Sequence, residues 1–412
     1  MLTKGWDTIS IVKQERINSD LKSIWGSIDP SFNYRDSGSE NIQITGIFDC
    51  WSIIDGGGGR ILRLELPINS GTFTLGKTQI GLEGTSAIIE VTLSLLPSKD
   101  NSAVLKSEYL NLAKNRSEMT PDKNGWVLPV TFLDPEGRLG AFSNVVLDLI
   151  CKYLLDNPEK FEIIFAEINF AKSGSPAWAI PKKSAYSYLD SGYLCILSVC
   201  SDKDISKLPL DIDVSGISLG VSSFYVMSSE LMLKNLILPG LIELYQNCSP
   251  DQFFFRENEL LNKNELRMHE IKSGAIYYTP IVYKEQNISA VEGSRINVYY
   301  NGDCDMYVGI TMYWNGSVKM NTSLDTNGSI LFTQEGRSFS HNVDIPWYLK
   351  WLSPIVGLIV TIVVEIISND LINSIESKSS SIKADSMNTV TWCNDSATVK
   401  SVILNESLIL EY

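Results

Sequence analysis

The sequence between Lys350 and Glu365 contains 14 consecutive residues without a charged side chain. A helix of that length reaches about 21 Å, whereas the hydrocarbon core of a bilayer is about 30 Å thick. The segment is therefore too short to span a membrane, and we expect it to be buried within the protein. Ser353 and Pro354 mark its start, because serine caps helices and proline suits the first helical position.

This predicted helix has two possible surroundings. It can fill a core, or it can lie along a curved sheet and leave an apolar gap for an acyl chain, since ligand pockets are mostly apolar. Both structures need the same aliphatic side chains, so the sequence leaves both open. The residues that would line such a groove share one helical face: Ile355, Leu358, Ile359, Ile362 and Ile366.

Extended segments dominate most of the remaining chain, because apolar and polar residues alternate there with the two-residue period of strands. Gly56 to Gly59 predict a hairpin rather than a phosphate-binding loop, since no helix follows them. Three Asn-Gly pairs, at 301–302, 315–316 and 327–328, predict tight turns in an all-β region. We predict strands over residues 42–45, 62–66, 80–96, 126–133, 161–170, 192–199 and 399–410.

Three further segments have the apolar periodicity of helices: 7–28, 143–155 and 229–245, the last interrupted near Pro239 and Gly240. A few long helices among many antiparallel strands indicate an α+β fold. A chain of 412 residues is long enough for two domains. We expect an N-terminal lobe over residues 1–205 and a C-terminal lobe over 206–412, or one continuous elongated domain.

The composition excludes several classes of function. The formal net charge of −14 argues against nucleic-acid binding and against adsorption to anionic membranes, because both need a positive surface. The first residues lack the apolar core of a secretory signal peptide, so we expect a soluble chain. The sequence does not indicate the compartment in which it works. The seven cysteines lack the close spacing of metal or redox sites and are expected to be mostly buried thiols.

Gly216-Ile217-Ser218-Leu219-Gly220 fits the pattern of a serine-hydrolase nucleophile elbow. That elbow needs a strand, a strained turn and then a helix. The surrounding residues continue as extended apolar sequence, so a strand is the simpler interpretation. A general base would have to be His269 or His341, since the chain has two histidines. No metal or cofactor site is expected, because the paired carboxylates at Asp211/Asp213 and Asp303/Asp305 lack the other ligands of a calcium loop.

Three N-terminal motifs carry a family resemblance. They are Gly5-Trp6-Asp7; Gly46-Ile47-Phe48, followed by Trp51 and Ile53; and Leu64 with Leu66-Pro67-Ile68, followed by Ser70-Gly71. Together they resemble the clostridial forty-seven-kilodalton accessory proteins encoded beside botulinum neurotoxin in OrfX-type gene clusters. The resemblance implies a TULIP-like fold, in which long helices are wrapped by highly curved antiparallel β-sheets. It brings no catalytic or lipid-contact residues.

Three hypotheses follow. The leading one is a non-enzymatic accessory protein of a toxin gene cluster that binds a lipid or another apolar ligand, and that is released with the toxin. The second is an assembly subunit whose groove is filled by its own side chains and which contacts other toxin-cluster proteins. The third is a serine esterase that uses Ser218.

Overall fold

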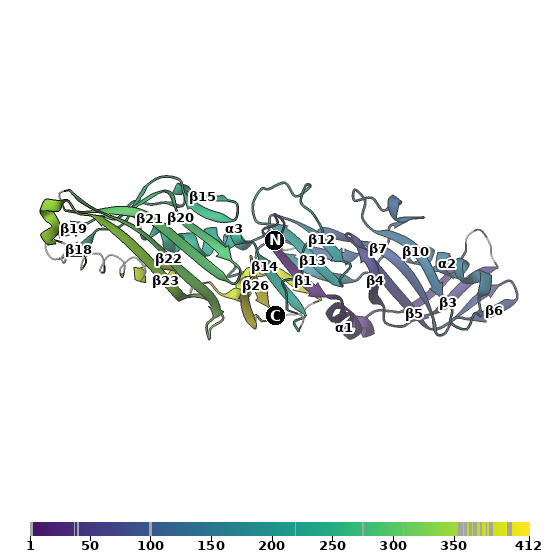
Figure 1. Cartoon of the computed structure of the whole chain (residues 1–412). Helices are drawn as coiled ribbons and strands as arrows, with labels where there is room; N and C mark the ends of the chain where they lie inside the picture. The colour runs from purple at the N-terminus through teal and green to yellow at the C-terminus, as the bar shows by residue number, and fades with distance from the viewer. Residues whose placement is uncertain are drawn as a thin grey trace.

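Three β-sheets lie one after another along an elongated molecule in this computed structural model, and we call them the N-terminal, central and C-terminal sheets (Figure 1). The described residues are mostly antiparallel β-structure with short helices, of which the longest, α2, has 14 residues. They are residues 3–36, 38, 41–98, 101–218, 220–273, 276–307, 309–352, 357, 361, 365, 369–370, 373–375, 377–378, 382–393 and 398–412. The many antiparallel strands are confirmed, whereas the long helices are not found in this part of the chain.

The N-terminal sheet owes its buried face to strict alternation. Leu62, Leu64 and Leu66 of β5 are buried, whereas Arg63 and Glu65 lie on the other face and are partly exposed. Helix α2 (Ser143–Asp156) packs against this sheet. The strands are β2 (Ser31–Arg35), β3 (Ile42–Phe48), β4 (Ser52–Gly58), β5 (Ile61–Leu75), β6 (Thr78–Gly81), β7 (Thr85–Ser98), β8 (Ser102–Ser107), β9 (Asn111–Leu112), β10 (Trp126–Leu133), β11 (Ile164–Asn169) and β24 (Val390–Trp392).

The four consecutive glycines form the predicted hairpin between β4 and β5, with Gly58 opposite Ile61. Gly56 has a φ of 106°, which glycine adopts at little cost. A Cβ on Gly57 would lie 2.5 Å from the Ile61 carbonyl oxygen and 3.0 Å from the Tyr188 ring. The Tyr188 amide donates to the Gly59 carbonyl oxygen at 2.6 Å. The glycines therefore let this hairpin pack closely against the central sheet.

The central sheet combines strands from distant parts of the sequence. Its order is β12 (Lys183–Leu189), β13 (Tyr193–Val199), β1 (Thr8–Lys13), β14 (Ser223–Met227), β26 (Leu408–Glu411) and β25 (Ser401–Leu404). Figure 1 accordingly places both ends of the chain near the middle of the molecule. The division into lobes at residue 205 stays a prediction.

The predicted helix over residues 7–28 is wrong in its first part. Thr8–Lys13 form β1, a strand between β13 and β14, and only Gln14–Ile24 form the helix α1. The cause is the run Thr8 to Val12, in which four of five residues are β-branched and all five are buried. Ile17 and Leu21, which the helical pattern placed on the apolar face, are the buried residues of α1.

The C-terminal sheet covers the predicted all-β region. Asn327-Gly328 forms the expected turn between β22 and β23, with Gly328 at φ 78°. The other two turn predictions are wrong, because Asn301 and Asn315 face each other in the middle of paired strands. The strands are β15 (Phe253–Arg256), β16 (Glu259–Asn262), β17 (Leu266–Arg267), β20 (Ile281–Glu292), β21 (Arg295–Tyr307), β22 (Ile310–Leu324) and β23 (Ile330–Asp344), and a separate hairpin pairs β18 (Ile271–Ser273) with β19 (Ile276–Tyr278).

The remaining predictions are mostly met. The segment 229–245 is helical in three parts, α3 (Ser229–Met232), the π-helix η5 (Leu233–Ile237) and α4 (Leu238–Ile242). The predicted final strand is instead a hairpin of β25 and β26. The seven cysteines are free thiols, but the expectation that most are buried is not met, because three are buried, Cys151, Cys195 and Cys304, and four are partly exposed. The other short helices are η1 (Trp25–Ser27), η2 (Arg116–Glu118), η3 (Gly140–Phe142), η4 (Ala177–Ala179), η6 (Pro250–Gln252), η7 (Trp347–Leu352) and α6 (Ala384–Met387).

Candidate functional site

The five residues predicted to line an apolar groove lie outside the described residues. They are Ile355, Leu358, Ile359, Ile362 and Ile366. The described positions between them are helical, and the Thr361 hydroxyl donates to the Gly357 carbonyl oxygen at 3.1 Å. Gly357, Thr361 and Glu365 are exposed, as is Asn373, whereas Ile375 is fully buried. The side of this helix that carries the exposed positions therefore faces solvent.

Helix α4 holds the end of this segment against the body of the protein. A Cβ on Gly240 would lie 2.7 Å from the Cα and amide nitrogen of Ile375, so only glycine permits this close approach of two backbones. Beyond this contact, Lys378 Nζ lies 2.6 Å from Glu243 Oε1. The Pro239-Gly240 interruption in the sequence thus marks a contact between two helices.

A pocket of about 460 Å³ opens beside the same segment. Its volume lies within the range typical of small-molecule sites. Leu244, Met268 and Ile271 are almost fully buried and supply its apolar part. The other lining residues are polar: Glu243, His269, Glu270, Lys272, Asp370, Asn373, Ser374 and Ser377. The pocket can therefore receive an amphipathic molecule, with its apolar part against the three buried side chains.

The C-terminal core also contains buried polar atoms with no hydrogen-bond partner among the described residues. They include the Tyr300 hydroxyl, Trp314 Nε1 and Asn287 Oδ1. Asn287 lies opposite Tyr300 in adjacent strands, and the Tyr300 and Trp314 rings are 6.4 Å apart. Burial raises the pKa of Tyr300, so its hydroxyl stays protonated and can donate. The interior of this region can therefore form hydrogen bonds to a buried polar group.

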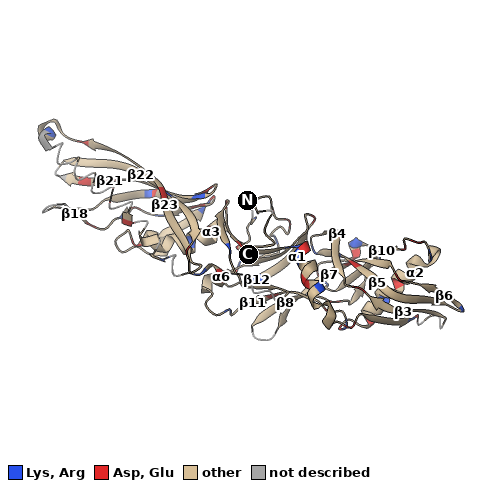
Figure 2. Ribbon diagram, turned by 90° about the horizontal axis from the view of Figure 1, so that it is seen from below, with Lys and Arg blue, Asp and Glu red and all other residues tan. Residues whose placement is uncertain are grey.

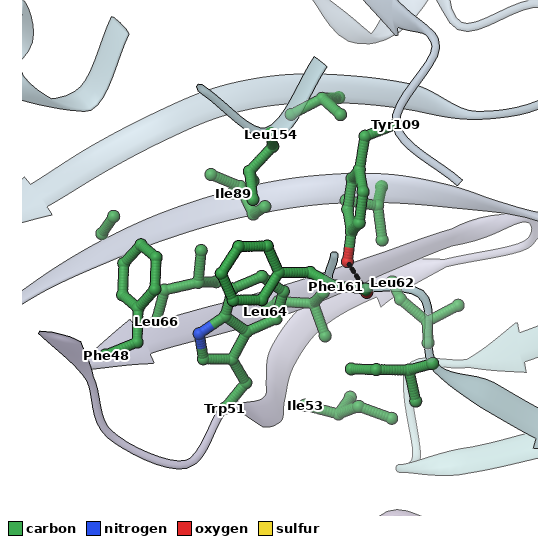
Figure 3. Close-up of a cluster of buried hydrophobic side chains, with 14 of the residues drawn as sticks. Phe48, Trp51, Ile53, Leu62, Leu64, Leu66, Ile89, Tyr109, Leu154 and Phe161 are labelled. Carbon is green, nitrogen blue, oxygen red and sulfur yellow. Dashed lines mark hydrogen bonds between the residues drawn. The ribbon is translucent and has the colours of Figure 1, made fainter. Parts of the chain in front are cut away.

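The N-terminal core is filled by its own aromatic side chains (Figure 3). The Trp51 and Phe161 rings stack with their centroids 4.9 Å apart, and Phe48 meets both rings edge-on. The Tyr109 hydroxyl donates to the Phe161 carbonyl oxygen at 3.3 Å. These rings occupy the space between β5 and α2. The described core at this end of the molecule is therefore packed by its own side chains.

Ser218 does not form a nucleophile elbow. It lies in the loop between β13 and β14, is partly exposed, and is followed by a strand instead of a helix. The alternative prediction of a strand at this position is also wrong, because residues 216–218 lie in this loop. The side chain of Ile217 packs into a core that the central sheet shares. Among the described residues, neither His269 nor His341 hydrogen-bonds to Ser218. The geometry that the motif requires for catalysis is therefore not formed.

The paired carboxylates contact other side chains of the protein. The Tyr283 hydroxyl donates to Asp303 Oδ2 at 2.7 Å, and Lys4 Nζ lies 3.3 Å from Asp211 Oδ2. The described part of the chain contains no group of three or more metal-ligating side chains. Within the same residues, no helix has the length and hydropathy to cross a bilayer.

Several residues of the pocket were missed by the sequence analysis. Met268 directly follows β17 and Ile271 begins β18, about a hundred residues before the last helix, so periodicity gives no sign that they meet it. One signal was available, because Pro239-Gly240 in a helical pattern indicates either a break or a close helix contact. The structure shows the contact.

The fold and the pocket together describe a mostly antiparallel β protein with an open amphipathic site beside a helix, and comparison with known proteins places it in a family. Residues 3–383 match the family model OrfX-like: Protein OrfX2/OrfX3/P47. The chain belongs to this family, which is related to the accessory proteins of botulinum neurotoxin clusters. The resemblance seen in the first 71 residues is thereby confirmed.

Individual relatives agree with this membership. Protein P47 of Clostridium botulinum (strain Kyoto / Type A2) is 25% identical over 73% of this chain and 72% of its own length. Protein OrfX3 of Paraclostridium bifermentans is 22% identical over 61% of this chain and 56% of its own. The structure of P47 from Clostridium botulinum A2 superposes with a TM-score of 0.76 at 21% identity, covering 99% of this chain and 97% of that one. This chain therefore shares the fold of P47 from Clostridium botulinum A2 along nearly its whole length.

Proposed function

We propose that this protein is a non-enzymatic accessory protein of a toxin gene cluster, with a TULIP-like fold, that binds a lipid or another apolar ligand beside its last helix. The observation that carries the proposal is the pocket of about 460 Å³ between that helix, α4 and β18. Family membership supports the accessory role. We further propose two lobes, 1–205 and 206–412, with the ligand in the second.

The chemistry of the pocket supports an amphipathic ligand. Each methylene group buried against Leu244, Met268 or Ile271 contributes roughly 0.8 kcal/mol, so even a short stretch of acyl chain gains useful affinity. The polar side chains around these three residues, three carboxylates and Lys272 among them, suit a polar end of the same molecule.

Mass spectrometry of organic extracts of the purified protein, together with titration of a fluorescent fatty acid, tests the proposal. Asn373 is exposed and lines the pocket, so Asn373→Trp fills space there without disturbing a core. We expect about a tenfold loss of fatty-acid affinity, since a filled pocket no longer accepts the chain. Asn369→Trp, on the same exposed helix but outside the pocket, is the matched control and should bind normally. Equal binding by both variants and the wild type would contradict the site.

A second candidate function is an assembly subunit that binds no lipid. The aromatic packing of the N-terminal core supports it, because the described core at that end is filled by its own side chains. Lipid-free purification of the protein in a stable complex with other products of its gene cluster would favour this function over the first.

A further inference from the structure

One end of the molecule carries exposed aromatic side chains on two separate projections, which we call the aromatic tip. The first projection is the β18–β19 hairpin, where Ile276 is 44% and Tyr277 57% exposed. The second is η7, where Trp347 is 81% and Tyr348 59% exposed. Figure 1 shows both at the extreme end beyond the C-terminal sheet. Exposed aromatic side chains that gather at one end of a molecule mark an interaction surface more often than single exposed apolar side chains do.

The residues of the tip have the chemistry of a membrane interface. Trp and Tyr combine an apolar ring with a hydrogen-bonding group, which places them at the headgroup level of bilayers. The Trp347 and Tyr348 rings pack edge-on with centroids 5.8 Å apart, so they present one rigid unit. Each projection also carries a lysine, Lys272 on β18 and Lys350 on η7. Lysine can lay its stem on apolar surface while its ammonium group reaches lipid phosphates.

The two projections belong to different elements, and Figure 1 places both at the same end of an elongated body. An extended plane can contact both projections at once, whereas a single concave pocket on a partner protein would accommodate one. Acidic residues are interspersed with basic ones along the molecule (Figure 2). With a net charge of −14, attraction to strongly anionic lipid is weak.

The aromatic tip is continuous with the pocket beside the last helix. Ile271 and Lys272 line that pocket from β18, and they pair directly with Tyr278 and Tyr277 of β19. The Lys272 ammonium group lies 5.5 Å from the centroid of the Tyr277 ring. A surface that meets the tip therefore comes within one strand of the pocket.

We propose that the aromatic tip docks this protein onto the interface of a zwitterionic lipid bilayer. Trp347, Tyr348 and Tyr277 enter the headgroup region, and the long axis of the molecule points away from the membrane. The docking stands independently of any ligand in the pocket, although it places the pocket beside the lipid.

Flotation with phosphatidylcholine vesicles tests the docking. We expect the wild type to float with the vesicles and the Trp347→Ser/Tyr277→Ser variant to partition about tenfold less, since two interfacial rings are lost. Both substituted residues are exposed, so folding is kept. Leu110→Ser/Ile164→Ser, which removes two exposed apolar side chains far from the tip, is the matched control and should float like the wild type.

Three results would overturn the proposal. The wild type could fail to float, the tip variant could float as well as the wild type, or the wild type could be a dimer that the tip substitutions convert to a monomer, which would assign the tip to a second copy of the chain. Fluorescent fatty-acid titration without vesicles separates this test from that of the pocket. The single variant Trp347→Ser, which leaves Tyr277 and Lys272 unchanged, should bind the fatty acid normally, and Asn373→Trp should still float.

Discussion

Glu90 is the most deeply buried carboxylate with two cationic partners in the described chain. It is 1% exposed, lies opposite Arg63 in the β5–β7 pairing, and accepts from Arg63 Nη2 at 2.6 Å. Arg116 Nε donates to its other oxygen at 2.7 Å. Burial alone would raise the pKa of Glu90, but the hydrogen bonds from Arg116 and Arg63 outweigh it, so the pKa is lowered. The ionised carboxylate therefore links strands β5 and β7 to η2, the short helix that carries Arg116.

The first prediction concerns this residue. Glu90→Gln should lower the free energy of unfolding at pH 7 by about 3 kcal/mol, because two arginines lose a buried counter-charge. The folded-state pKa is depressed, so this stabilisation is present above the unfolded-state pKa of about 4.3 and disappears as the pH falls through the folded-state value. Urea unfolding at pH 7 and pH 3 measures both effects, and the difference between variant and wild type should shrink in acid.

Glu162→Gln is the control for this experiment. Glu162 pairs with Lys106 at 2.8 Å, but its side chain is 35% exposed. Exposed ion pairs contribute less than about 1 kcal/mol. Equal losses in the two variants would contradict the role assigned to Glu90.

At the scale of elements, glycines decide where backbones can meet. Gly240 brings α4 against the last helix, and Gly302 lets β21 approach β20, since a Cβ there would lie 1.8 Å from the Ile281 carbonyl oxygen. Glycine is needed at these two positions because any side chain would collide with the neighbouring backbone. Their φ values are ordinary, so backbone conformation is not the reason. From the sequence, Gly240 was predicted to interrupt a helix and Gly302 to form a turn.

Gly240→Ala should lower the free energy of unfolding by about 1–3 kcal/mol, because the new methyl group meets the Ile375 backbone. Alanine favours helix over glycine by about 1 kcal/mol, so a loss despite this gain identifies the steric cause. Thermal unfolding followed by circular dichroism measures it. Gly26→Ala, where nothing lies within 4 Å of the new Cβ, is the control; a similar loss there would contradict the explanation.

Local patterns predicted elements well where one face alone is buried. The helix from residue 143 has nearly the predicted bounds, because its apolar residues follow a clear period. The strand at 126–133 also has the predicted bounds, although a bulge between Pro129 and Thr131 interrupts its alternation. Prediction failed where tertiary contacts determine the conformation. Thr8–Lys13 are buried on both faces, so their pattern has no strand period, and Asn301-Gly302 is held extended by its neighbours on both sides.

At the scale of the whole molecule, the sequence indicated the β-rich class and, through its resemblance, the family. It could not indicate that β1 and β26 share the central sheet, because each pairs with β14, about 180 to 210 residues away in the sequence, and such long-range pairing leaves no local signal. The pocket depends on a similar long-range meeting of α4, β18 and the last helix. The walls of the pocket that come from other parts of the chain were therefore not predictable, and the groove residues on the last helix stay a prediction.

Removing residues 401–412 should abolish cooperative folding. Leu408, Ile409 and Leu410 are fully buried, and burying each contributes about 1.5–3 kcal/mol, which together approaches the total stability of an ordinary domain. Size-exclusion chromatography and thermal unfolding measure the outcome. Ile409→Ala should lose a smaller amount, about 2–5 kcal/mol, while Ile164→Ala at an exposed site should lose little. A truncated chain that unfolds like the wild type would contradict this account.

The place of β26 in the central sheet also affects synthesis of the protein. Its partner β14 ends at Met227, about 180 residues before Leu408. At 5–20 residues per second, a ribosome needs roughly ten to forty seconds to make that interval. Throughout it, one hydrogen-bonding edge of β14 has no partner, and such an edge readily pairs with other chains. The nascent protein should therefore depend on chaperones during this interval.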